Sequence, residues 1–494
     1  MSELERLSSA KRALLERALR QRRQAAAASR TTIPRRRERG PAPLSYSQQR
    51  MWFLQQWEPD APTFNGARAI RMCGPLHRAA LSHGLATILE RHESLRTVVV
   101  GTAEPQQVVL DTWSFELPMI SLTESGQESG LSALLRELSR EPFDLATDLM
   151  LRATLIELSD EEHVLLIRMH HIAADAHSDS VLFGELAELY NAGIEGRAPQ
   201  LPELSIQYSD FAVWQRERLR GSRLDELVAY WTRQLEDAPA LLALPTDRPR
   251  RAVQRHEGAH LGLAFPRSLV APLLSLGREE GVTFFMTMLA AFTALLYRIS
   301  GEHDIVLGSP IANRNDLQLQ PLIGFFTNTI ALRTRLDGNP SFREVMRRAR
   351  VTALGAYAHQ DLPFEKVVEA LRPKRDPSYN PLFQVNFRAQ ATERPALRLA
   401  GIRAQPIAVD IGFSRFDLAL EVELGEHELT GYFEYDRDLF DADSISALIE
   451  DLGALLAEIG AEPDAPILAL KLSREQRTAR RRTAGRTIAR RPSK

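Results

Sequence analysis

The sequence predicts a mixed α/β protein that folds as two lobes of similar size. Amphipathic helical patterns alternate with short apolar runs of strand length from about residue 41 to residue 470. A stretch rich in proline and arginine at 239–251 lies near the middle of this region, and we expect the chain to cross between the lobes there. The chain of 494 residues is long enough for two sizeable cores. Halves of similar size and pattern are compatible with a duplicated fold.

The elements of the first lobe surround a pair of histidines. Leucines at four-residue spacing predict a helix over 76–91. The apolar run Val164–Met169 predicts a buried strand that leads directly into His170 and His171. A helix is expected from about Ser180, with Gly193 as its C-terminal stop. The histidines therefore lie at a strand end before a loop, where functional residues are often placed.

The second lobe is expected to have the same mixture of elements. The clearest helix covers Thr283–Tyr297. Apolar runs predict strands over Asp304–Ser309 and Asn328–Arg333, and a late strand that ends near Tyr435. We therefore divide the chain into an N-terminal lobe at 41–240 and a C-terminal lobe at 241–470.

The two ends of the chain are basic, whereas the body is acidic. Residues 1–40 sum to a charge of +8, residues 471–494 to +9, and the remainder to −19. Ser8 and Ser9 begin a predicted short helix, and residues 34–41 are interpreted as a basic linker. We expect flexible, solvated ends that can dock an acidic carrier protein. No nucleic-acid partner is expected, because the ends lack interleaved aromatic residues.

Composition also restricts the location and chemistry of the protein. No apolar run reaches the roughly 18–20 residues that span a bilayer, and the N-terminus has no signal-peptide pattern. We expect a cytoplasmic monomer with no membrane partner. Cys73 is the only cysteine, so the chain forms no internal disulfide and no cysteine-based metal site. Its position in an apolar run favours a small buried side chain over a nucleophile.

The run HHIAAD, His170 to Asp175, carries the candidate chemistry. An imidazole in a cleft can act as a general base near neutral pH. Asp175 is too close in sequence to be assumed a relay, and pairing with an Arg or with backbone N–H groups is the alternative role. A metal site that adds His177 and Asp179 is disfavoured, because adjacent residues at a strand end point to opposite faces and the spacing matches no zinc signature.

Seven stretches in order resemble the motifs of one family, the condensation domains of nonribosomal peptide synthetases. The match extends over about 41–470, with HHxxxD as the active-site motif. The matching stretches are Leu44–Leu54, Arg91–Thr97, His170–Asp175, Tyr208–Trp214, Ile323–Arg333, His359–Glu365 and Arg375–Gln384.

The resemblance implies a fold and a reaction. The fold is two chloramphenicol-acetyltransferase-like lobes, each an α+β two-layer sandwich, arranged as a V with a tunnel between them. Acyl donor and acceptor, carried on phosphopantetheine arms of partner carrier proteins, meet at His171. No cofactor is bound by the chain itself. His171 orients or deprotonates the acceptor nucleophile, and the resemblance leaves open which of the two it does.

The resemblance also implies roles for other residues. His170 belongs to the catalytic motif, and Asp175 is expected to hold the loop through a salt bridge to Arg91 or Arg96. Both arginines also have a purely structural interpretation at the end of a helix. Asn328 is expected to face the site from the second lobe. The backbone N–H of Ala176 is the candidate donor to the oxyanion of the tetrahedral intermediate.

The sequence departs from the family motif directly after Asp175. Ala176 replaces the glycine of HHxxxDG, and His177 stands where a bulky aromatic residue is common. Alanine is tolerated there only if its φ is negative. Only in that case can the backbone N–H of Ala176 act as the donor to the oxyanion. The imidazole of His177 is expected to widen or polarise the tunnel.

The chain contains neither a carrier-protein attachment motif nor an adenylation core. We therefore expect a free-standing enzyme that receives a donor carrier in trans and uses a carrier-bound or free acceptor. Its product is an amide or an ester, with chain release as one outcome. Two alternatives remain open. An epimerisation domain shares the fold and the motif, but the fourth, sixth and seventh motifs favour condensation. A non-catalytic recruitment module is compatible with Ala176, although such modules lose the catalytic residues that persist here.

Overall fold

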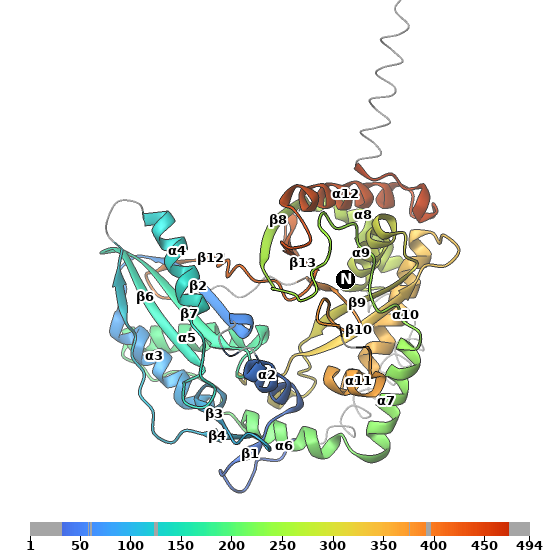
Figure 1. Ribbon diagram of the computed structural model, residues 1–494. Coiled ribbons are helices and arrows are strands. Elements are labelled where there is room, and N and C mark those ends of the chain that lie inside the picture. Colours follow the sequence, from blue (N-terminus) through green and yellow to red (C-terminus); the bar gives the residue numbers. More distant parts are fainter. Residues whose placement is uncertain are drawn as a thin grey trace, which may run out of the picture.

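The computed structural model describes residues 32–57, 59, 62–122, 127–374, 376–391 and 397–473. The predicted helix after Ser8 and the basic end from residue 474 onward lie outside the described residues. The described chain forms two lobes side by side, each built on its own sheet (Figure 1).

The first lobe has a five-stranded sheet with two helices on one face and one helix on the other. On β7, Leu165 and Ile167 lie in the core that also contains buried residues of α3 and α5. Val164 and Leu166, which point to the opposite face, pack with leucines of α4. The strand order is β12-β2-β7-β6-β5. The elements are β2 (Asn65–Cys73), β5 (Met119–Ser121), β6 (Leu151–Ser159), β7 (Glu162–His170), β12 (Arg403–Ile407), α3 (Arg78–Arg91), α4 (Gln127–Arg140) and α5 (Ala176–Glu195).

The second lobe has a six-stranded sheet in the order β10-β9-β11-β13-β14-β8. Helix α9 is the centre of its core, and every residue from Met286 to Tyr297 is buried. The strands are β8 (Gly258–Pro266), β9 (Asp304–Ile311), β10 (Asn328–Arg335), β11 (Val385–Gln390), β13 (Leu418–Leu424) and β14 (Glu428–Asp436). The helices packed on this sheet and on one another are α8 (Arg267–Glu279), α9 (Phe284–Ser300), α10 (Phe342–Ala358) and α12 (Ala442–Ala461).

Further short elements lie along and between the lobes. Helices α6 and α7 run in succession from the first lobe to the second (Figure 1). The helices are α2 (Tyr46–Trp57), α6 (Tyr208–Arg218), α7 (Gly221–Leu235) and α11 (Phe364–Leu371). A small sheet contains β1 (Ala42–Pro43), β3 (Thr97–Val100) and β4 (Gln106–Val109). The 3-10 turns are η2 (Pro62–Phe64), η3 (Glu93–Arg96), η4 (Leu317–Leu319) and η5 (Ile467–Ala469).

Two segments of the second half of the chain return to the first lobe. Strand β12 pairs antiparallel with β2, with Arg403 opposite Cys73 and Ile407 opposite Ala69. The connection 312–327 between β9 and β10 contacts η3, where Ser94 Oγ donates to Ile323 O at 2.8 Å. The division of the sequence near residue 240 did not anticipate either exchange.

Most predicted elements have the expected type. The helix and strand that frame the histidines, the helix of 283–297 and the three strands of the second lobe are confirmed with ends shifted by a few residues. The stop at Gly193 is wrong. Helix α5 continues to Glu195 and ends at Gly196, whose φ of 67° is the left-handed conformation that ends a helix.

The segment 34–41, interpreted as a linker, packs against the body instead. The preceding Ile33 is 1% exposed and lies in a cluster with Tyr208 and Phe326. Its backbone N–H donates to Gln318 Oε1 at 2.9 Å, and that of Arg36 donates to Asp210 Oδ1 at 2.9 Å. An isoleucine side chain therefore anchors this basic segment, which charge composition alone could not reveal.

Within the described ranges, no single helix is long and apolar enough to span a membrane. Helices α8 and α9 reach that length and composition only as a pair, bent by 114°.

Candidate active site

The strand β7 places the two histidines at the edge between the lobes. Its register with β2 puts His170 opposite Asn65, and the His171 N–H donates to Phe64 O at 2.8 Å. The chain then turns and enters α5, whose N-cap is Asp175. The motif is thus fixed at one end by a sheet and at the other by a helix cap.

His171 has one ring nitrogen engaged and the other available. Its Nδ1 lies 3.3 Å from Ala174 O, and because a carbonyl can only accept, Nδ1 carries the proton. Nε2 of the neutral ring then presents a lone pair, and no described residue occupies it with a hydrogen bond. The side chain is half-buried, with the Phe325 ring centroid at 6.3 Å. This tautomer suits a proton acceptor.

The surroundings of His171 disfavour its charged form. Burial and then the Arg415 guanidinium lower the pKa of His171 from 6.5 to about 4, although the hydrogen bond to Ala174 O opposes the shift. The imidazole is therefore neutral at physiological pH.

His170 is fully enclosed, which gives it a structural role rather than the catalytic one expected. It is 1% exposed, and the rings of Phe64 and Phe143 lie at 6.1 and 5.9 Å. Its Nδ1 accepts from Ile172 N–H at 3.1 Å, and Nε2 faces Gln55 Oε1 at 3.4 Å. Burial, with a contribution from His171, lowers its pKa to about 3. Both nitrogens are used, so His170 has no free group for catalysis.

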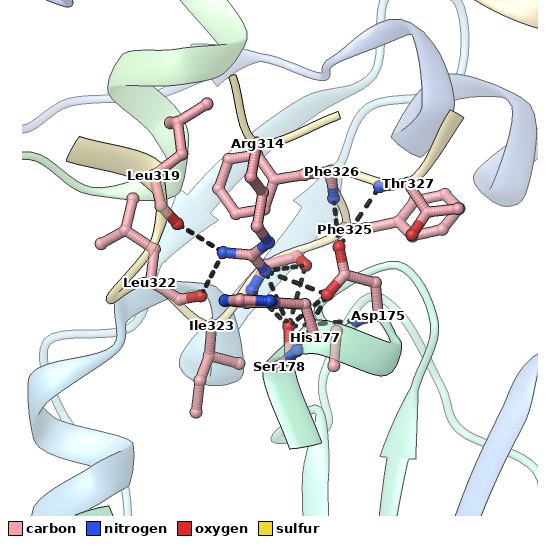
Figure 2. A network of polar contacts seen from close by, with 12 residues as sticks. Asp175, His177, Ser178, Arg314, Leu319, Leu322, Ile323, Phe325, Phe326 and Thr327 are labelled. Carbon is pink, nitrogen blue, oxygen red and sulfur yellow. Dashed lines mark hydrogen bonds and ion pairs between the residues drawn. The ribbon is translucent and has the colours of Figure 1, made fainter. Parts of the chain in front are cut away.

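Asp175 is the hub of a buried polar network (Figure 2). Its carboxylate accepts from Ser178 N–H at 3.0 Å and from Ser178 Oγ at 2.8 Å. The Asp175 backbone N–H in turn donates to Ser178 Oγ at 3.1 Å, which completes a capping box. It also accepts from Phe326 N–H at 3.0 Å and from Thr327 N–H at 3.2 Å, both in the second lobe's β9–β10 connection. Arg314 completes the set with a salt bridge of 2.9 Å. Asp175 therefore joins the lobes and is not a proton relay.

Arg314 was not predicted, yet it carries the counter-charge of Asp175. Both side chains are 1% exposed. Its Nη1 donates to Leu319 O and Leu322 O, and its Cζ lies 4.2 Å from the Phe326 ring centroid (Figure 2). A buried carboxylate requires a cation or several hydrogen-bond donors. Arg314, in the loop before the fifth motif, was the residue in the sequence that could have indicated this salt bridge.

The expected salt bridge from Asp175 to Arg91 or Arg96 is wrong. Arg91 makes a bidentate pair with Glu185 of α5, with N–O distances of 3.1 and 3.0 Å. Arg96 donates to Leu110 O at 2.7 Å. Both arginines lie near the end of α3, whereas Asp175 is enclosed by the β9–β10 connection. Their structural interpretation is the one that the contacts support.

Asn328, which was expected to face the site, is enclosed by backbone partners in the structure. It is 5% exposed, and its Nδ2 donates to Gln360 O at 2.9 Å and Leu362 O at 2.8 Å. Its Oδ1 accepts from Phe364 N–H at 3.0 Å and from Thr329 N–H at 2.9 Å. The amide is saturated by backbone partners, so Asn328 fixes the turn before α11 against β10.

Ala176 and His177, the two departures from the motif, begin helix α5. Ala176 is exposed and is not among the described residues with positive φ, so the condition for a usable amide is met. As a first-turn group its N–H has no acceptor within the helix. His177 Nε2 lies 3.0 Å from Gln320 O, which makes it a second link to the other lobe.

Two arginines, Arg68 and Arg415, add positive charge near His171. Arg68 lowers the pKa of His171 slightly, but its own charge is paired with Asp179 at 2.7 Å. Arg415 approaches from the second lobe. In the described ranges, no three His, Cys, Asp or Glu side chains are grouped as metal ligands would be.

Comparison with known proteins supports the motif resemblance. The family model "Condensation domain" matches residues 38–480. One of the linear gramicidin synthase proteins of Brevibacillus parabrevis is 44% identical over 436 residues, which cover 87% of this chain and 6% of that protein. Phosphinothricin tripeptide synthetase PhsC of Streptomyces viridochromogenes is 40% identical over 472 residues, 94% of this chain and 43% of that protein. The chain thus spans less than half the length of these relatives.

Solved structures match the whole architecture. The X-domain from teicoplanin biosynthesis is 30% identical with a TM-score of 0.82, over 89% of this chain and 100% of that one. The first condensation domain of the calcium-dependent antibiotic synthetase has a TM-score of 0.75 at 20% identity, over 87% and 99%, and shows the fold alone. The predicted fold class, two lobes of mixed helix and sheet, is confirmed.

Proposed function

The chain belongs to the condensation-domain family of nonribosomal peptide synthetases, and on that premise we propose that it moves an acyl chain from a carrier-bound phosphopantetheine thioester to an amine or hydroxyl nucleophile. The family forms amide bonds. We also propose that the acceptor is an amine or a hydroxyl group, that partner carriers act in trans, and that chain release is one outcome.

The observation that carries the proposal is the free Nε2 of His171. The neutral tautomer fixed by Ala174 O leaves a lone pair that can accept the proton of a nucleophile. A base with a pKa of about 4 is too weak to deprotonate a free ammonium or hydroxyl group beforehand. In this proposal His171 therefore orients the neutral nucleophile and accepts its proton only as the new bond forms.

The remaining residues hold this geometry. The Asp175–Arg314 network fixes the loop between β7 and α5 from the opposite lobe. The Ala176 N–H stays the predicted backbone donor to the carbonyl oxygen at the helix N-terminus. The reactants would then meet where the two lobes adjoin.

Intact-mass analysis of a loaded donor carrier tests this function. The carrier is mixed with candidate amine and hydroxyl acceptors, free or on a second carrier, and with wild-type enzyme or the His171→Ala variant. We expect acyl transfer with wild type and a loss of at least about 100-fold in the variant. The exposed His303, replaced by Ala, is the matched control. Transfer by His171→Ala at the wild-type rate would refute the proposal.

A second candidate, a recruitment module, is favoured by the likeness to the X-domain. That domain, at 30% identity, was also solved in complex with the protein OxyB. A module of this kind would bind its partner equally well as wild type and as His171→Ala, and it would transfer no acyl chain. The mass assay therefore separates the two candidates.

A further inference from the structure

Arg415 reaches from the second lobe to the backbone beside His171. It lies on the connection between β12 and β13, and its Nη2 donates to Thr63 O in the first lobe at 3.1 Å. Its Cζ lies 5.2 Å from the centroid of the Phe64 ring. The next residue, Phe64, accepts the backbone N–H of His171 through its carbonyl oxygen. Arg415 therefore donates to the residue directly before the one that positions the His171 backbone.

Unlike Arg314 and Arg68, the guanidinium of Arg415 has no carboxylate partner among the described residues. Arg314 and Arg68 each pair with a carboxylate within 3 Å. The Nε of Arg415 is buried with no hydrogen-bond partner in the described ranges; the Nε of Arg314 is also unpartnered, but there the charge is paired with Asp175. Burial lowers the pKa of Arg415 to about 10, so it remains charged at neutral pH.

A second unpaired donor lies on the residue that Arg415 contacts. Thr63 Oγ1 is also buried, and it too has no partner in the described part of the chain. A buried donor without a partner costs roughly 1–3 kcal/mol, and a charged donor costs more. An unsatisfied buried group requires an explanation, and a catalytic role, in which a reacting group completes its hydrogen bonds, is one such explanation.

We propose that Arg415 Nε, with Thr63 Oγ1 beside it, donates to the carbonyl oxygen of the donor thioester and stabilises its negative charge in the tetrahedral intermediate. The inference rests on the proposed function. The nucleophile attacks the carbonyl carbon, the C=O electron pair moves to oxygen, and His171 Nε2 takes the proton. Collapse restores C=O and breaks the C–S bond, and the sulfur leaves as a thiol with the proton from His171.

The charge of Arg415 acts on both partners in this step. It attracts the developing oxyanion. It also lowers the pKa of His171, which keeps the resting ring neutral with its lone pair available but makes the ring a weaker base. Glu434, whose charge raises the pKa of Arg415, accepts the Arg415 backbone N–H at 3.2 Å and forms no salt bridge with the guanidinium. The positive charge is therefore left for the reacting group.

Two stable analogues of the acyl-pantetheine donor test the proposal: an amide that mimics the ground state and a phosphonate that mimics the anionic intermediate. Affinities and steady-state kinetics are compared for wild type, Arg415→Gln, Arg415→Lys and Thr63→Val. Arg136→Gln is the matched control, because Arg136 also contacts the segment before β13, through Asp410 at 2.7 Å, but on an exposed surface.

We expect Arg415→Gln to lower kcat by about 100–1,000-fold and to change KM by no more than about threefold relative to wild type. The affinity of this variant for the phosphonate should fall by a similar factor, whereas its affinity for the amide should stay unchanged. Arg415→Lys should recover part of the loss, Thr63→Val should lose about tenfold, and Arg136→Gln should match wild type. An unchanged ratio of phosphonate to amide affinity in Arg415→Gln, while wild type still forms the bond, overturns this inference alone. Absence of bond formation by wild type with every donor and acceptor refutes the proposed function instead.

Discussion

The replacement of Arg314 by Met should destabilise the protein strongly, although the residue contacts no reacting atom. The change leaves the Asp175 carboxylate buried with its backbone donors but no counter-charge, and it also removes the donors to Leu319 O and Leu322 O. Loss of one partner from a buried ion pair costs about 3–5 kcal/mol. We therefore expect the free energy of unfolding to fall by that amount in urea or guanidinium denaturation.

A double-mutant cycle separates the pair from the rest of the network. In Asp175→Asn with Arg314→Met, no unpaired charge remains, so the double variant should be more stable than the sum of the two single losses predicts. The exposed pair Arg197–Glu188 is the control, and Arg197→Gln should leave the unfolding free energy unchanged within error. Additive losses in the cycle, or a loss under about 1 kcal/mol for Arg314→Met, would refute the view that charge pairing holds this loop.

Three further predictions concern His171, Asn328 and Ile33. Because burial and Arg415 lower the pKa of His171 to about 4, a pH–rate profile measured with a hydroxyl acceptor, which does not titrate in this range, should stay flat from about pH 7 to pH 5. Protonation of His171 should destabilise the fold as pH falls from 6.5 toward 4, and an acid limb near 6.5 in that profile would contradict the shift. Asn328→Ala should lower the unfolding free energy by about 2–4 kcal/mol, because it leaves buried backbone groups without hydrogen-bond partners. KM should stay unchanged, and a selective rise in KM would instead support the predicted substrate role of Asn328. Ile33→Ala should cost about 2–4 kcal/mol in chemical denaturation, and no loss would mean that the anchoring of 32–40 is incidental.

The sequence predicted local structure well, because hydrophobic periodicity reports which face of an element is buried. The strand before His170 and the helix after Asp175 follow from that signal, and the family motifs identified His171. Long-range pairing was not predictable in the same way. Arg91 and Arg314 both lie near motif residues, and only the fold decides which one meets Asp175.

The role of Asn328 shows a second limit. A polar residue at the start of a strand can face a substrate or satisfy nearby backbone groups, and its residue type is equally suited to both. The carbonyls that occupy its amide belong to residues more than 30 positions away in sequence. Arg415 lies outside all seven motifs, so no local pattern could associate it with His171.

The pairing of β12 with β2 has a consequence for engineering chimaeric synthetases. A recombination point near residue 240 would give each hybrid a first-lobe sheet whose edge strand comes from the foreign parent. The side chains of 403–407 and 65–73 would then be mismatched across a complete strand pair. A compatible exchange must transfer residues 397–409 together with the first lobe, so the modular unit of this fold is discontinuous in sequence.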